Sequence, residues 1–234
     1  NNMLFNSRET VPQTDLPEIK PPNIEEFLKP TKSIKFIWFG HSSMLVNINN
    51  IIILIDPVFS DAASPVSFIV PRFQPPVLGL ENLPKIDYIL ISHDHYDHLD
   101  METILYFKEK KVKFITPLGV TSHLKKWRIA ESKLFELDWW EEIKFKGISF
   151  VCTPAQHFSG RLGTLNVSKT LWASWVVKSD SINFYYSGDS GYDIHYKQIG
   201  DKYGPFDLAF IDSGQYNIRW REVHNLPEEA AQAF

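Results

Sequence analysis

The chain has 234 residues, of which 44% are hydrophobic and 14% aromatic, which is enough for one sizeable core. Its formal net charge of −4, from 24 Lys and Arg against 28 Asp and Glu, provides no basic surface for nucleic acid, and we expect no nucleic-acid partner. The single cysteine, Cys152, excludes an intrachain disulfide, and its apolar neighbours favour a buried structural thiol over a nucleophile.

Residues 1–33 are rich in proline and are expected to form an extended N-terminal arm, with one helical turn at residues 24–28. Regular structure is predicted to begin at residue 34, and residues 34–234 are expected to form one domain. Runs of β-branched and aromatic residues predict its strands, which lie at residues 34–40, 44–48, 51–56, 87–92, 113–116, 134–137, 143–153, 171–178, 184–187 and 208–212. Helical spacing predicts helices at residues 101–110 and 120–127, and Pro227 followed by two glutamates is typical of the start of a last helix.

Two local patterns describe the first strands more closely. Asn49 and Asn50 separate two strand runs, and asparagine tolerates the positive φ of a two-residue hairpin turn, so we expect a hairpin there. The run 51–55 is apolar at every position, which indicates a sheet covered on both faces.

A long connection, residues 57–84, contains apolar stretches at 65–71 and 75–80. Long loops in compact domains often form lids or binding walls. The equally weighted alternative is a loop that simply packs over the sheet.

A dense cluster of metal-binding residue types follows the strand predicted at residues 87–92. The six residues after it are His93, Asp94, His95, Tyr96, Asp97 and His98. Neutral imidazole and carboxylate groups bind zinc and neighbouring divalent metals, and a turn can direct some of them to one ion and the rest to a second. The alternative is a solvated polar turn or a surface tract that binds metal weakly, and the apolar strand before the cluster argues against it.

Two remote residues repeat this placement at the end of an apolar strand. His157 follows the run ending at Thr153, and Asp189 lies between glycines in Ser187-Gly-Asp-Ser-Gly191. A lone histidine after a strand is more often structural than a ligand, but open α/β sheets place their sites at the carboxyl ends of strands. We therefore group both residues with the cluster.

The order His93-x-His95-x-Asp97-His98, then His157, then Asp189 resembles the metallo-β-lactamase-fold hydrolases. Further segments resemble the branch of that family that contains N-acylphosphatidylethanolamine-hydrolysing phospholipase D. They include Pro-Ala-Gln-His-Phe-Ser-Gly-Arg at 154–161, Leu-Trp-Ala-Ser-Trp at 171–175, Gly-Pro-Phe-Asp-Leu-Ala at 204–209 and His-Asn-Leu-Pro-Glu-Glu-Ala at 224–230. The similarity extends from about residue 34 to residue 234.

The resemblance implies an α+β protein with a four-layer αβ/βα sandwich and two divalent metal ions, usually Zn2+, between the sheets. It assigns His93, His95 and His157 to the first metal and Asp97 and His98 to the second, with Asp189 bridging both. The family has a seventh ligand, a histidine, which we expect beyond residue 234. The domain is therefore expected to lack its C-terminal part and to bind its second metal poorly.

The resemblance also places His224 in the active site, as a catalytic proton donor or a supporting residue rather than a ligand. Asp97 is assigned a catalytic role in orienting the attacking hydroxide. Asp56 and His41 are candidates for residues that hydrogen-bond to the metal ligands and orient them, against the equal alternative that either merely packs. The next candidate is Trp220, as a wall of the substrate pocket.

Three other residues are expected to lie away from the chemistry. Trp172 and Trp175 are expected in the core, and His123, beside two lysines on a short helix, is expected to face solvent. The role of His195 stays open.

The resemblance implies a metal-dependent hydrolase, a phosphodiesterase of the phospholipase D-like type that uses a hydroxide bridging two divalent metals. Its substrate would be a small-molecule or lipid phosphodiester, with the loop 57–80 lining a groove for acyl chains. One alternative is a lactonase or other ester or amide hydrolase on the same metals. Another is a non-catalytic metal-dependent binding protein.

The sequence also bears on location. No apolar stretch approaches the roughly 20 residues of a membrane-spanning helix, and the first residues lack the pattern of a signal peptide. We expect a cytoplasmic protein, and peripheral membrane contact stays open.

Overall fold

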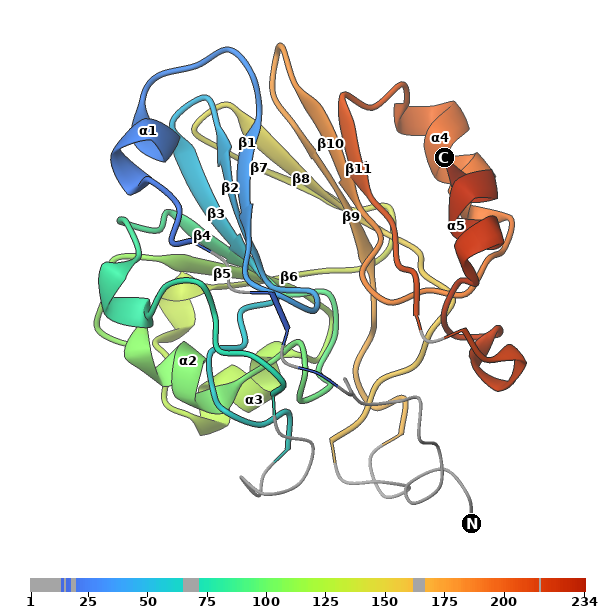
Figure 1. The fold of residues 1–234 in the computed structure, drawn as a ribbon, viewed down its shortest axis with the longest axis horizontal. Helices are drawn as coiled ribbons and strands as arrows, with labels where there is room; N and C mark the ends of the chain where they lie inside the picture. Colours follow the sequence, from blue (N-terminus) through green and yellow to red (C-terminus); the bar gives the residue numbers. More distant parts are fainter. Residues whose placement is uncertain (1–13, 15, 18–19, 65–71, 162–166, 215) are drawn as a thin grey trace.

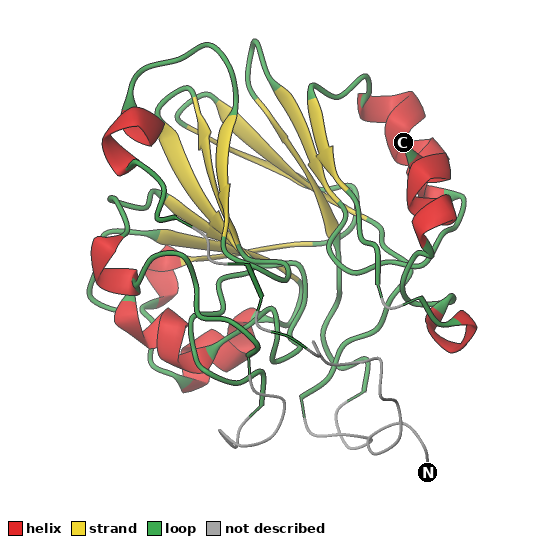
Figure 2. Cartoon of the chain, in the orientation of Figure 1, coloured by secondary structure: helices red, strands yellow, loops and turns green. Residues whose placement is uncertain are grey.

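The computed structural model describes residues 14, 16–17, 20–64, 72–161, 167–214 and 216–234. Two β-sheets lie face to face, and helices cover the outer face of each sheet (Figures 1 and 2). The helices outside the first sheet are α1 (Ile24–Leu28), α2 (Met101–Tyr106) and α3 (Thr121–Lys126), and those outside the second are α4 (His195–Tyr203) and α5 (Pro227–Ala233). This arrangement confirms the predicted α+β class and four-layer αβ/βα sandwich.

The first sheet has the strand order β1-β2-β3-β4-β5-β6. Its strands are β1 (Lys35–Trp38), β2 (Met44–Ile48), β3 (Ile51–Ile55), β4 (Tyr88–Leu90), β5 (Lys113–Pro117) and β6 (Leu134–Leu137). β1, β2 and β3 pair antiparallel, whereas β3 to β6 pair parallel. The carboxyl ends of β1, β3, β4 and β5 therefore meet at one edge.

The second sheet has the strand order β11-β10-β9-β8-β7. Its strands are β7 (Glu142–Phe145), β8 (Ile148–Thr153), β9 (Ser174–Lys178), β10 (Asn183–Tyr186) and β11 (Leu208–Phe210). β7 to β10 pair antiparallel, and β10 pairs parallel with β11. As a result β8, β10 and β11 end at the same edge.

Side chains of successive strand residues enter different apolar layers because they point to opposite faces of a sheet. Ile53 and Ile55 of β3 join the central cluster between the sheets, where they meet residues such as Trp175. Ile52 and Leu54 join an outer cluster with residues of α2 and α3. The apolar run 51–55 is thus covered on both faces, as predicted, and Cys152 is a fully buried free thiol in the central cluster.

A third cluster lies on the outer face of the second sheet, where Tyr196 and Ile199 of α4 pack against residues such as Val176. The sequence analysis did not predict α4, although its buried residues Tyr196 and Ile199 are three apart, which is helical spacing. The polar residues Lys197 and Gln198 between them, and Gly200 after them, weaken the helical pattern. Among the described residues, no helix combines the length and apolar character needed to cross a membrane.

Turn chemistry explains how the observed strands and helices differ from the predicted ones. Asn49 and Asn50 both have positive φ, which confirms the predicted hairpin. Lys146 and Gly147 also have positive φ and divide the single strand predicted at 143–153 into β7 and β8. α2 ends at Tyr106 instead of residue 110, because the following amides bond three residues back, as Phe107 N does to Ile104 O at 3.1 Å.

The N-terminal arm is only partly described, since residues 1–13, 15 and 18–19 lie outside the described residues. The predicted helical turn is present as α1, and its Phe27 is buried in the outer cluster. Asn47 of β2 donates a hydrogen bond from Nδ2 to Phe27 O at 2.9 Å, so this part of the arm is fixed to the sheet. The boundary between residues 33 and 34 stays a prediction.

The connection 57–84 is described except for residues 65–71, on which part of the predicted lid falls. In the described part, Leu78 and Leu80 pack against the outer cluster. Arg72 holds the loop down by donating hydrogen bonds to Val58 O at 2.8 Å and Phe39 O at 3.0 Å. The described residues of this loop therefore pack over the sheet, which agrees with the alternative to a lid or binding wall.

Candidate metal centre

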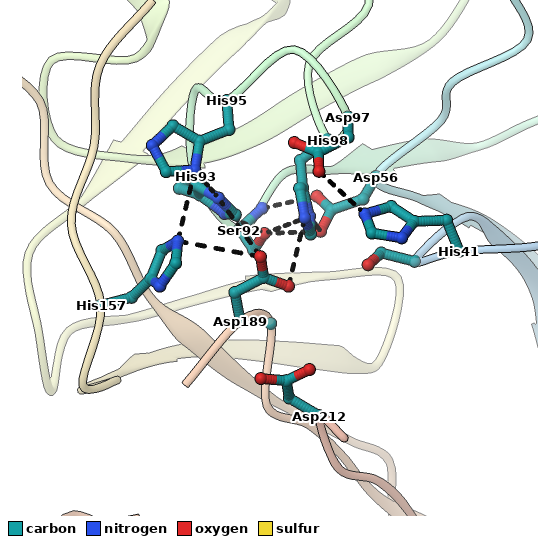
Figure 3. A network of polar contacts seen from close by, with 12 residues as sticks. His41, Asp56, Ser92, His93, His95, Asp97, His98, His157, Asp189 and Asp212 are labelled. Carbon is teal, nitrogen blue, oxygen red and sulfur yellow. Dashed lines mark hydrogen bonds and ion pairs between the residues drawn. The ribbon is translucent and has the colours of Figure 1, made fainter. Parts of the chain in front are cut away.

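The candidate residues come together because each follows the carboxyl end of a strand at the shared edge of the two sheets. From the first sheet come His41 after β1, Asp56 after β3 and the cluster 93–98 after β4. From the second come His157 after β8, Asp189 after β10 and Asp212 after β11. In Figure 3, His93, His95 and His98 of the first sheet lie close to His157 and Asp189 of the second.

Three histidines present ring nitrogens to one point. His95 Nδ1 lies 2.9 Å from His93 Nε2 and 3.3 Å from His157 Nε2 (Figure 3). A tetrahedral zinc ion with Zn–N bonds of about 2.0–2.1 Å separates its nitrogen ligands by about 3.3 Å. Both distances from His95 Nδ1 are thus close to the spacing of a zinc ligand set, and all three nitrogens lie within 4.8 Å of one another.

Hydrogen bonds behind the rings orient these nitrogens. His157 Nδ1 lies 2.9 Å from Val223 O and donates its proton there, since a carbonyl only accepts. This leaves the Nε2 lone pair facing the site. His93 Nδ1 lies 2.9 Å from Ser92 Oγ. Such partners fix the ring orientation and tautomer of metal-binding histidines.

A second donor group contains His98 and Asp97. His98 Nδ1 donates to Asp56 Oδ2 at 2.8 Å, so Nε2 faces the site. Nε2 is fully buried and has no hydrogen-bond partner among the described residues, although it lies 3.2 Å from Asp189 Oδ1. An unpaired buried nitrogen beside a carboxylate is costly unless a cation lies between them. The residues present therefore fit a metal ion.

Asp189 faces both donor groups. Its Oδ2 lies 3.9 Å from His93 Nε2 and 3.7 Å from His157 Nε2, while its Oδ1 is the oxygen near His98. Gly188 before it has positive φ, and a Cβ there would lie 2.8 Å from Ala173 O and 2.9 Å from Ser92 Cβ. Only glycine lets the chain approach so closely and place one carboxylate oxygen toward each group.

Asp56 is fully buried behind His98. Besides His98 Nδ1, its carboxylate accepts hydrogen bonds from Ser92 N at 2.7 Å, Ser92 Oγ at 2.5 Å and Tyr186 OH at 2.6 Å. These contacts agree with the ligand-orienting role expected of Asp56, which stays a prediction. Tyr186 and Ser92 were not predicted.

The electrostatics favour neutral rings at His93 and His157 and an ionised carboxylate at Asp97. Burial lowers the pKa of His157 to about 4 and holds the pKa of His93 well below its usual value. Burial acts to raise the pKa of Asp97, but the neighbouring His41 and His98 outweigh it and lower that pKa. For His98, burial is outweighed by Asp189 and Asp56, which raise its pKa, so positive charge is favoured between these carboxylates.

His224 lies beside the donor groups and is held by a residue that was not predicted. Its Nδ1 lies 2.9 Å from Asp212 Oδ2 and 3.9 Å from Asp189 Oδ2. Asp212 also accepts from Ser190 N at 3.2 Å. With Nδ1 bonded to Asp212, the placement of His224 agrees with an active-site role, which stays a prediction. Asp212 directly follows a strand, which is the signal that could have identified it.

A cavity of about 810 Å³ opens over the centre. Asp97, Asp189 and His224 line its polar part. Its apolar part includes Trp38, Met44, Phe210 and Trp220, so Trp220 lies where a pocket wall was predicted. No described residue of the connection 57–84 lines it, so these residues do not form the groove that was expected of the loop.

A second network joins the cluster 93–98 to the segment that carries His157. Asp94 Oδ2 lies 2.9 Å from His123 Nε2, and Asp94 Oδ1 accepts from Gly160 N at 2.7 Å. Arg161 donates to Asp94 O at 2.9 Å and stacks on the Tyr96 ring at 4.0 Å. The expectation that His123 faces solvent is wrong, because its ring turns inward to this carboxylate, with 17% of the side chain exposed.

The other histidine and tryptophans of the sequence analysis lie apart from the donor groups. His195 is buried at the start of α4, with Nε2 3.1 Å from Ser190 Oγ. Trp175 is fully buried and donates to Ile91 O at 3.0 Å across the sandwich, while Trp172 is half-buried and donates to Ala155 O at 2.9 Å.

The side chains of His93 and His98 are 1% and 0% exposed. Their burial contradicts the alternative that the cluster is a surface tract that binds metal weakly.

Comparison with known proteins agrees with this geometry. A family model described as the beta-lactamase superfamily domain matches residues 52–234. An uncharacterised protein of Mycobacterium tuberculosis is 43% identical over 198 residues, which are 84% of this chain and 53% of the relative. A Caenorhabditis elegans protein named N-acyl-phosphatidylethanolamine-hydrolyzing phospholipase D 1 is 39% identical over 208 residues, which are 83% of this chain and 58% of the relative.

Among solved structures, Igni18, a metallo hydrolase from the archaeon Ignicoccus hospitalis, matches with a TM-score of 0.63 and 22% identity. The match covers 86% of this chain and 76% of Igni18, and it establishes the shared fold. The chain spans about half the length of the two curated relatives described above.

Proposed function

The chain belongs to the beta-lactamase superfamily, and we propose that it is a metal-dependent phosphodiesterase of the N-acylphosphatidylethanolamine phospholipase D-like type. The observation that carries the proposal is the cavity of about 810 Å³, in which metal-binding side chains lie beside an apolar wall. The name of the Caenorhabditis elegans relative supports a lipid phosphodiester as the substrate class.

In this proposal His93, His95 and His157 would hold one metal ion, Asp97 and His98 would hold a second, and Asp189 would contribute to both. The donor set of imidazole and carboxylate favours Zn2+. When bound, two divalent cations supply Lewis acidity, which lowers the pKa of water and neutralises charge on phosphate oxygens.

His224 would act on the leaving group. Burial acts to lower its pKa, but the hydrogen bond to Asp212 and the charge of Asp189 outweigh burial and raise that pKa. A proton is therefore favoured on the ring. With Nδ1 bonded to Asp212, Nε2 is the nitrogen that can donate a proton to the departing alkoxide.

The apolar wall would exclude water and accept hydrocarbon. Trp38 and Phe210 lie on the two edge strands β1 and β11, and Trp220 lies on the segment before His224. Aromatic side chains bury a large apolar area. A phosphodiester attached to an acyl chain could thus place its phosphate at the donor groups and its chain along this wall.

We further propose that the protein is cytoplasmic and contacts membranes peripherally.

The test is hydrolysis by zinc-loaded protein of N-acyl-phosphatidylethanolamine, bis(p-nitrophenyl) phosphate and an N-acyl-homoserine lactone. We expect the lipid to give phosphatidic acid and N-acylethanolamine, with ¹⁸O from labelled water in the phosphatidic acid. The His95→Ala variant is the matched control and should lose this activity. Lactone hydrolysis without phosphodiester hydrolysis would contradict the proposal and support an esterase-type reaction.

A further inference from the structure

The first donor group draws its histidines from two segments that belong to different sheets. His93 and His95 follow β4 of the first sheet, and His157 follows β8 of the second. Their ring nitrogens lie within 4.8 Å of one another. Each ring moves with its own segment, so the spacing that a metal ion needs depends on how the two segments are fixed to each other.

The carboxylate of Asp94 joins these two segments. Asp94 lies between two of the candidate ligands in the chain, and its side chain is buried, with 3% exposed. Its Oδ1 accepts a hydrogen bond at 2.7 Å from the backbone N of Gly160, three residues after His157. Its Oδ2 accepts from His123 Nε2 of α3 at 2.9 Å. Both oxygens are therefore bonded to residues outside the donor group.

Arg161 ties the same segments a second time. Its Nη1 donates to Asp94 O at 2.9 Å and to Leu99 O at 2.6 Å, so it reaches both ends of the turn that carries the candidate ligands. Its guanidinium also stacks on the Tyr96 ring, 4.0 Å from the centroid. Hydrogen bonds from a charged donor are stronger than neutral ones, and a planar guanidinium fits an aromatic face. The turn is thus fixed to the chain that follows His157.

We propose that Asp94 and Arg161 are positioning residues for the first metal ion. They hold the segment after β8 against the turn after β4 and thereby set the 3.3 Å distance between His157 Nε2 and His95 Nδ1. Neither side chain donates an atom to the ion. This inference rests on the metal centre of the proposed function, and it concerns only the first donor group.

The alternative is a network that stabilises the fold without affecting the ion, and the chain contains a pair for comparison. Asp87 Oδ1 accepts from Lys146 Nζ at 2.8 Å, and Asp87 Oδ2 accepts from Ile52 N at 3.1 Å. Asp87 directly precedes β4, and Lys146 lies in the turn before β8. This pair therefore joins the same two strands at the edge away from the candidate ligands.

The first experiment is a zinc titration of the metal-free 234-residue chain by calorimetry, with a competing chelator that resolves the first binding step. Asp94→Ala and Arg161→Ala should each weaken this step about 10- to 100-fold, because the ligand segments lose a tie. Asp94→Asn retains an acceptor for Gly160 N and should recover most of the affinity. The matched controls Asp87→Ala and Lys146→Ala should bind the first zinc ion as wild type does.

A second experiment reads the geometry of the first site with Co2+ in place of zinc. The d–d bands of cobalt depend on the arrangement of its ligands, so they report a displaced histidine directly. We expect altered bands in Asp94→Ala and Arg161→Ala, and wild-type bands in Asp94→Asn and in both controls. Urea unfolding of each metal-free variant measures the stability of the fold separately.

The outcomes separate the positioning role from the metal centre. Wild-type zinc affinity and cobalt bands in both Asp94→Ala and Arg161→Ala would overturn the positioning role and leave the proposed function standing. A loss in Asp94→Asn as large as that in Asp94→Ala, or an equal loss in Asp87→Ala, would overturn it as well. A wild type that binds no zinc would overturn the metal centre itself.

Discussion

At the scale of single residues, carboxylates behind the histidines control the site. Asp56 holds His98, and Asp212 holds His224, each through the ring nitrogen Nδ1. In both cases the other nitrogen is left to face the centre. Each carboxylate therefore decides the orientation and the tautomer of a functional ring, which makes it a sharp target for substitution.

We predict that Asp212→Ala lowers kcat for a lipid phosphodiester by roughly 10²-fold, because His224 loses the partner that holds its proton and its orientation. For bis(p-nitrophenyl) phosphate, whose leaving group needs no proton, the loss should be much smaller. Steady-state kinetics on both substrates test this. Equal losses on both, with reduced zinc content, would instead indicate damage to the metal centre.

We predict that Asp56→Ala destabilises the fold by about 3 kcal/mol, because it leaves buried donors such as Tyr186 OH without their acceptor. Zinc affinity should fall about 10- to 100-fold, since His98 is no longer oriented. Urea unfolding and zinc titration measure the two effects. Asp56→Asn keeps the shape and part of the hydrogen bonding, so a loss as large as that of Ala would argue against this account.

At the scale of elements, the ends of helices and strands carry the polar groups while their middles carry the core. α4 departs from this division, because the polar residue at its first position is buried. It begins at His195, which is buried, and a helix N-terminus disfavours positive charge. Burial lowers the pKa of His195 to about 4 from its ordinary value of 6.5.

We predict that this histidine makes the fold acid-sensitive. In the folded protein it stays neutral down to a pH of about 4, whereas in the unfolded chain it takes up a proton below 6.5. Between these values unfolding binds a proton, so stability is full above pH 6.5 and falls by about 3 kcal/mol as the pH approaches 4. Denaturant unfolding of wild type and His195→Gln across this range should show the difference between them growing by that amount. A constant difference would contradict the prediction.

At the scale of the whole molecule, the candidate centre joins the two sheets. His93, His95 and His98 come from the first sheet, and His157 and Asp189 come from the second. A metal ion bound by both groups would therefore oppose separation of the sheets.

We predict that zinc raises the free energy of unfolding by about 4 kcal/mol when free zinc is near 1,000 times the dissociation constant of one site. Thermal unfolding with zinc and with a chelator measures the change. His93→Ala should lose most of it, because that ring belongs to the group shared by both sheets. Equal stability of wild type with and without zinc would be the contrary result.

The sequence by itself determined much of this protein. Apolar periodicity indicated most strands, and paired asparagines indicated the hairpin. The placement of His93, His157 and Asp189 directly after strands identified them as candidate ligands. These features depend on residues that are near each other in the chain, where local sterics and side-chain alternation act directly.

Only the tertiary structure decided which distant residues meet. His41 lies against Asp97, His123 turns to Asp94, and Asp212 holds His224. The first two contacts join segments that are separated along the chain and are brought together by strand order, and the third is set by how the chain folds back after β11. A local pattern records that a residue follows a strand, but the neighbours at that strand end depend on how the whole sheet pairs and packs.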